Sequence, residues 1–260
     1  MLKSVRSLAL GASVAVAALS GALLAGPAHA LTKEQKAEFE TLIKDYLIKN
    51  PEVIQEALIE LERRQRDAEV AARQKVLKDD GGKLYASKFN AVAGNPQGDV
   101  TLIEFFDYNC GYCKRALVDL QKLVKEDPKL KVVLKDLPIL SPQSRDAAAV
   151  ALAVKGLAKP EDFWTFHTTL MAKTGQIGKP QALEVAAGIG IDAAKIEKEL
   201  ARPDIAEAFE ESRKIADALG LTGTPSYILA DDVVVGAVGF QQLKSRIDNV
   251  RKCGKSECNG

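Results

Sequence analysis

The chain has 260 residues, with 36 basic and 35 acidic side chains and four cysteines. This near-neutral balance, without a block of basic residues, argues against a nucleic acid as the main partner. Beyond the first thirty residues no segment is long and apolar enough to span a membrane, and the remaining ~230 residues suit one large domain or one domain with an appendage.

Residues 1–30 have the layout of a secretory signal peptide. Two basic residues open the segment, residues 8–24 are apolar, and residues 28–30 form an A-x-A cleavage site. The alternative is a membrane anchor, which the short apolar stretch and the processing site disfavour. We predict a mature chain from Leu31, with 34 basic and 35 acidic residues and a net charge of −1. Its expected location is the bacterial periplasm, an oxidising compartment.

Residues 31–80 are predicted to be an N-terminal helical segment. Apolar side chains recur at helical spacing from Phe39 to Leu47, and Asn50-Pro51 then interrupts the pattern. Asn50 is expected to cap a second helix that ends at Gly81-Gly82. Two short amphipathic helices bury little apolar surface by themselves. They therefore dock on the main domain or on other copies of the chain, and we favour an oligomerisation segment.

Residues 81–260 are predicted to form an α/β domain with a thioredoxin-like fold. The expected order is strand, helix, strand, helical block, strand, strand, helix. The strands are placed at about 100–107, 131–135, 226–229 and 233–235, and the helices at 111–126, within 142–219 and at 240–251. The helical block is an insertion at about 141–200.

Cys110 and Cys113 form a C-x-x-C motif between a predicted strand and a predicted helix. A sulfur at a helix N-terminus is favoured as a thiolate, the form that attacks disulfides. A zinc site needs about four ligands, and only His167 and the distal cysteine pair remain to complete one, so no metal is expected. A structural disulfide stays an alternative to a redox-active dithiol.

Three further positions are candidate site residues. Glu104 falls inside an apolar strand, where a buried carboxylate needs a partner or a role such as moving protons to or from Cys113; the alternative is a strand-edge residue facing water. Pro225 begins a strand, which a cis Thr224–Pro225 bond explains, although most X–Pro bonds are trans. Tyr112 lies between the cysteines and cannot stabilise a thiolate as a protonated histidine does. Tyr112, Thr224 and Pro225 are the residues expected to contact the substrate.

Cys253 and Cys258 close a small loop after the last predicted helix. We predict a structural disulfide that pins the C-terminal tail. An accessory redox pair that passes electrons to the main site is the alternative, because short exposed bridges can be labile.

Segments 105–114, 135–140 and 223–227 together resemble the DsbA family of thioredoxin-fold oxidoreductases, and the N-terminal extension is similar to that of its ScsC-like branch. The resemblance covers nearly all of the chain after residue 30. It implies that Cys110 is the nucleophile, Cys113 the resolving cysteine, Glu104 the buried acid and Pro225 the cis-proline. No cofactor is expected.

Whether the protein oxidises or isomerises disulfides is inferred from positions at which this chain differs from the strong oxidases of the family. Strong oxidases of the family usually have Pro-His between the cysteines, whereas this chain has Gly111-Tyr112. That dipeptide, with Thr224 before the proline, is similar to the dimeric DsbC isomerases. In ScsC-like relatives the extension makes trimers associated with isomerase activity. The resemblance thus implies a homo-oligomer, a trimer, that isomerises or reduces disulfides.

The partners expected from these features are exported cysteine-containing proteins and a membrane redox partner. An isomerase needs a membrane reductant, and the alternative, a DsbA-like oxidase, needs a membrane oxidant. An alternative of another class is a chaperone-like or copper-binding protein that uses the two thiolates as soft ligands.

Overall fold

The computed structural model describes residues 32–258, so the predicted signal peptide lies outside the described residues. These residues fall into two compact units, one up to Ile59 and one from Glu60 onward. Between residues 32 and 258 no helix is both long and apolar enough to cross a membrane.

Helix α1 (Lys33–Lys49) begins with a capping box, in which Thr32 and Gln35 exchange side-chain and backbone hydrogen bonds. None of its residues is buried, although it carries the predicted apolar side chains. Asn50, expected to cap the next helix, instead ends α1, with its backbone N–H and its side-chain amide both bonded to the Tyr46 carbonyl.

Helix α2 (Glu52–Ala86) is 35 residues long. The predicted stop at Gly81-Gly82 is wrong, because the helix continues to Ala86. The reason is tertiary packing: Leu84 is buried in a core cluster, and Val76 and Leu77 pack against the same cluster. Burial of this face outweighs the weak helix propensity of two glycines.

The second unit contains one five-stranded sheet in the order β1-β3-β2-β4-β5. Its strands are β1 (Ala91–Gly94), β2 (Val100–Phe106), β3 (Leu130–Asp136), β4 (Ser226–Leu229) and β5 (Asp232–Val235). β2 runs parallel to β3, and all other pairs are antiparallel. Four of these strands are as predicted from the sequence. β1 was not predicted, because Ala-Val-Ala-Gly has little β-branched or aromatic character.

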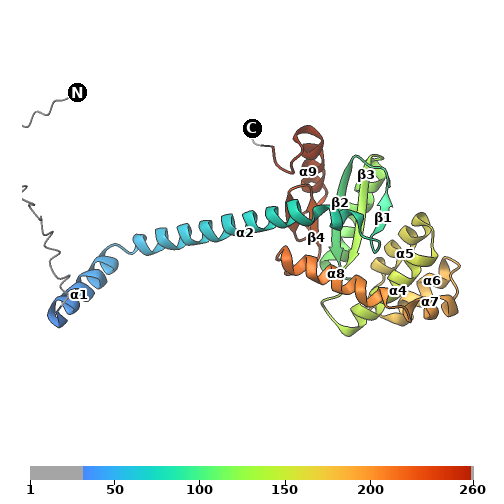
Figure 1. The fold of residues 1–260 in the computed structure, drawn as a ribbon, viewed down its shortest axis with the longest axis horizontal. Helices are drawn as coiled ribbons and strands as arrows, with labels where there is room; N and C mark the ends of the chain where they lie inside the picture. The colour runs from blue at the N-terminus through green and yellow to red at the C-terminus, as the bar shows by residue number, and fades with distance from the viewer. Residues whose placement is uncertain (1–31, 259–260) are drawn as a thin grey trace, which may run out of the picture. The chain divides into compact units, whose positions relative to one another are not determined.

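Helices cover both faces of this sheet (Figure 1). α3 (Gly111–Glu126) and α9 (Phe240–Cys253) pack on the face of Leu102 and Phe106. α8 (Asp204–Ala218) and the end of α2 pack on the face of Ile103 and Phe105. The insertion consists of α4 (Pro142–Leu157), α5 (Pro160–Ala172), α6 (Lys179–Gly188) and α7 (Ala193–Leu200). The expected thioredoxin-like α/β fold with a helical insertion is confirmed.

Candidate active site

Cys110 follows strand β2 and is the N-cap residue of α3. Its Sγ accepts a hydrogen bond from the Cys113 backbone N–H at 3.4 Å and lies 3.1 Å from the Thr224 carbonyl oxygen. Hydrogen bonds from the Cys113 thiol and from backbone N–H groups of Cys113 and Tyr112 lower the pKa of Cys110 to about 5, against the effect of burial. A thiolate at a helix N-terminus, as predicted, is the form that this geometry favours.

Cys113 lies in the first turn of α3 and is 1% exposed. Its pKa is raised because its thiol donates to Cys110 and because burial and the nearby Glu104 disfavour another negative charge. Both cysteines are free thiols in the structure. One sulfur is thus poised as a thiolate and the other stays protonated, an asymmetry that suits an attacking and a resolving cysteine.

Glu104 lies in the middle of β2, paired with Leu134 of β3 and Tyr227 of β4. It is 3% exposed, so the alternative of a strand-edge residue facing water is wrong. Tyr227 Oη donates a hydrogen bond to Glu104 Oε1 at 3.4 Å. Burial raises the pKa of Glu104 to about 8. A carboxyl with this pKa can both release and take up a proton near neutral pH.

The Thr224–Pro225 peptide bond is cis, as the sequence indicated. The carbonyl oxygen of Thr224 faces Cys110 Sγ across 114 residues of sequence. The carbonyl oxygen of Pro225 accepts a hydrogen bond from the backbone N–H of Gly236 at 2.8 Å. This contact holds the cis peptide bond against the end of the β4–β5 hairpin. The two predicted residues Thr224 and Pro225 are therefore placed beside the cysteines.

Tyr112 is on the surface at the start of α3, with 61% of its area exposed. Its ring lies 4.2 Å from the guanidinium carbon of Arg115, a cation–π contact. The side chain is open to an incoming protein chain next to Cys110, which fits the substrate-contacting role expected of it.

The turn before Cys110 carries buried polar residues that sequence reasoning missed. Asp107 accepts hydrogen bonds from the backbone N–H groups of Asn109 at 2.8 Å and Leu140 at 3.1 Å. Tyr108 Oη is 3.2 Å from Nδ1 of His167, and burial lowers the pKa of His167 to about 3. The only local signal was the Asx residues at a strand-to-helix junction, which indicate a turn and not its distant partners.

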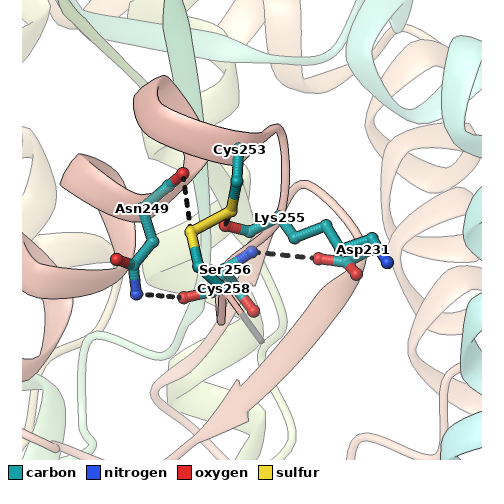
Figure 2. Close-up of a disulfide and its surroundings, with 6 residues drawn as sticks. All are labelled: Asp231, Asn249, Cys253, Lys255, Ser256 and Cys258. Atoms are coloured by element: carbon teal, nitrogen blue, oxygen red, sulfur yellow. Dashed lines mark hydrogen bonds between the residues drawn. A yellow bond between two sulfur atoms is a disulfide. The ribbon is translucent and has the colours of Figure 1, made fainter. Parts of the chain in front are cut away.

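Cys253 and Cys258 form a disulfide at the end of α9 (Figure 2). The loop that it closes is held by Ser256, whose carbonyl accepts from Asn249 Nδ2 at 3.0 Å and whose N–H donates to Asp231 Oδ1 at 3.1 Å. These bonds fasten the tail to α9 and to the turn between β4 and β5. The bridge itself agrees with the prediction; its structural role stays a prediction.

The described residues contain no group of three or more His, Cys, Asp and Glu side chains arranged to hold a metal ion.

Comparison with known families gives two matches along the chain. Residues 101–248 match the family model of the DSBA-like thioredoxin domain. Residues 35–68 match the model of the copper resistance protein ScsC N-terminal domain.

Solved structures and curated proteins show the same similarity. A thioredoxin-like oxidoreductase from Silicibacter pomeroyi is 36% identical, with 67% of this chain and 98% of that chain covered and a TM-score of 0.63. Proteus mirabilis ScsC in a transitional conformation is 27% identical, with coverage of 85% and 96% and a TM-score of 0.61. Disulfide bond formation protein D of Bacillus subtilis is 24% identical over 178 residues, 64% of this chain and 78% of that protein.

Other curated relatives are much longer than this chain. It spans 24% and 21% of two Na(+)/H(+) antiporters NhaA, from Salinispora arenicola and Salinispora tropica, and is 26% identical to each over 158 and 140 residues.

Proposed function

This chain belongs to the DSBA-like thioredoxin domain family, and we propose that it catalyses thiol–disulfide exchange on exported proteins through Cys110 and Cys113, as an isomerase or reductase in the periplasm. The observation that carries the proposal is the position of Cys110 Sγ at the N-cap of α3, 3.1 Å from the Thr224 carbonyl. The sulfur is stabilised as a thiolate and lies next to a backbone edge that an extended client segment can pair with.

The exchange begins when the Cys110 thiolate attacks one sulfur of a client disulfide. A mixed disulfide forms, and the other client sulfur leaves as a thiolate. In isomerisation a client thiolate then displaces Cys110, so the client gains no electrons. In reduction Cys113 attacks Cys110 and closes the intramolecular disulfide, the Cys113 proton passes to the carboxylate form of Glu104, and the client gains two electrons.

The preference for isomerisation or reduction rests on the N-terminal unit and on Gly111-Tyr112. In α1 the side chains of Phe39, Leu42 and Ile43 are all more than half exposed, an apolar stripe that monomeric proteins rarely leave uncovered. We therefore infer that α1 joins several copies of the chain, an assembly that would present several dithiols to one client. The predicted signal peptide at residues 1–30 supports the proposal of a periplasmic location.

Replacing Cys113 with serine should trap clients on Cys110. The resolving thiol is then absent, so mixed disulfides should accumulate on the order of tenfold or more over the wild type. The measurement is non-reducing electrophoresis after alkylation in cells. In the same background, Cys253→Ser with Cys258→Ser is the matched control and should leave the trapped amount unchanged. A protein that only binds clients or copper would trap none.

Replacing Leu42 with lysine should turn an oligomer into a monomer. The side chain is 62% exposed in the single chain, and in the proposed assembly its charged replacement would be buried at an interface at a high cost in free energy. Light scattering at micromolar concentration measures the mass. Lys44→Glu, off the apolar stripe of α1, is the control. If the wild type is already a monomer, the oligomer is refuted.

The low pKa of Cys110 favours one alternative, a disulfide oxidase, because a stabilised thiolate makes the disulfide form a stronger oxidant. Alkylation and gel shift of Cys110 and Cys113 in cells separates the two directions. A mostly reduced pair supports isomerase or reductase, and a mostly oxidised pair supports oxidase.

A further inference from the structure

The segment between α5 and α6, residues 173–178, which we call the brace, lies against the cysteine motif. Asn109 Oδ1 accepts from the backbone N–H of Ile177 at 2.7 Å, and its Nδ2 donates to the Ile177 carbonyl at 2.8 Å. On the other side of the motif, Lys114 Nζ donates to the carbonyl of Lys173. The residues immediately before and after the C-x-x-C therefore hold the two ends of the brace.

The brace is itself fixed to the interior of the helical insertion. The Ile177 side chain is fully buried in the main core cluster. Asn109 Nδ2 also lies 3.1 Å from Ser144 Oγ, in the first turn of α4. The backbone N–H of Ser144 in turn donates to Oγ of Ser141, the N-cap residue of α4. Because its core side chain is immobilised, the brace is a rigid support for the turn that it contacts.

The position of Cys110 Sγ depends on that same turn. The Cys110 backbone N–H donates to the Asp107 carbonyl at 3.0 Å, and its side chain must point back over the first turn of α3 to accept from Cys113 at 3.4 Å. An N-cap side chain reaches these N–H groups only when the N-cap residue is held in an extended, non-helical conformation, as Cys110 is here. Asn109 directly precedes Cys110, so its position sets where the chain enters α3.

We propose that Asn109 is a positioning residue for the attacking sulfur: its double hydrogen bond to Ile177 clamps the turn before Cys110 to the brace and keeps Sγ over the N–H groups of α3. The inference deepens the exchange chemistry proposed above and rests on it. Without the amide, the buried N–H and C=O of Ile177 lose their partner, and the turn shifts to find another. The sulfur then loses part of its stabilisation as a thiolate.

The test is Asn109→Ala, with the pKa of Cys110 measured from the ultraviolet absorbance of its thiolate. We expect a rise of about one unit, a tenfold loss of thiolate stabilisation. The same tenfold change should make the reduction potential about 30 mV more negative at neutral pH. Asn95→Ala is the matched control, because Asn95 also bonds two backbone groups, of Pro128 and Gln97, at a turn away from the motif. It should leave the pKa and the potential unchanged.

A second variant, Asn109→Ser, keeps a small polar group that admits water. It serves as the test if the alanine variant does not fold. It should also raise the Cys110 pKa. If a folded Asn109 variant loses thermal stability but keeps the wild-type pKa and potential, the residue is only structural and the proposal is overturned. A shifted pKa without client trapping by Cys113→Ser would instead refute the proposed function and leave the positioning role in place.

Discussion

Replacing Glu104 with glutamine should stabilise the protein at pH 7 by about 3 kcal/mol and slow its resolution step by on the order of a hundredfold. Burial raises the pKa of Glu104 from 4.5 to about 8. A carboxyl whose pKa is raised on folding favours the folded state fully below pH 4.5, and this contribution is lost as the pH rises toward 8. At pH 7 about two and a half units of the shift act, each worth about 1.4 kcal/mol.

The measurement for Glu104→Gln is urea unfolding of both proteins from pH 4 upward. The two stabilities should converge below pH 4.5, where the acid becomes protonated in both states, and separate as the pH rises. Glu126→Gln, at an exposed position, should follow the wild type at every pH. A Glu104→Gln curve parallel to the wild type would mean that the carboxyl titrates normally, and unchanged resolution of mixed disulfides would remove its proton-transfer role.

The reduced protein should lose about 2 kcal/mol of stability between pH 7 and pH 5 beyond any loss of the oxidised protein. Hydrogen bonds from Cys113 lower the pKa of Cys110 from 9.0 to about 5. A thiol with a depressed pKa stabilises the folded state fully above pH 9, and this contribution is lost as the pH falls through 5. The interval from pH 7 to pH 5 covers two of the four units of this shift, each worth about 1.4 kcal/mol, and partial screening by solvent lowers the expected value to about 2 kcal/mol.

Unfolding of the reduced and oxidised forms in urea, at matched pH, isolates this effect, because no thiol titrates in the disulfide form. The reduced Cys110→Ala variant is the control and should show the pH dependence of the oxidised wild type. Parallel stability curves for the two wild-type forms between pH 5 and pH 8 would contradict a thiolate stabilised by α3.

Local features of this chain could be predicted from sequence because their causes lie within a few residues. The C-x-x-C at the start of α3, the β4–β5 hairpin and the cis Thr224–Pro225 bond all belong to this class. Each depends on turn chemistry, capping or alternation of side chains. The end of α2 shows the limit: Gly81-Gly82 indicates a stop locally, and burial of Leu84 carries the helix past it.

Glu104 shows how much of the site the sequence pattern of one strand can predict. The sequence placed Glu104 inside an apolar strand and left open whether it faces water. The sheet order decides this, because β3 and β4 flank β2 on both sides. Strand order is set by pairings between segments up to 127 residues apart, such as Leu102 with Leu229 or Glu104 with Tyr227. No periodicity within β2 contains that information.

The sequence by itself determined the family resemblance and, through it, which cysteines are expected to attack and to resolve and which residues are expected around them, because short motifs carry this information. Only the tertiary structure decided which distant groups of the chain contact those motifs. The Thr224 carbonyl reaches Cys110 across 114 residues, and Ile177 reaches Asn109 across 68. Such contacts form when the helical insertion and the β4–β5 hairpin pack on one core, and packing is a property of the whole chain rather than of any segment.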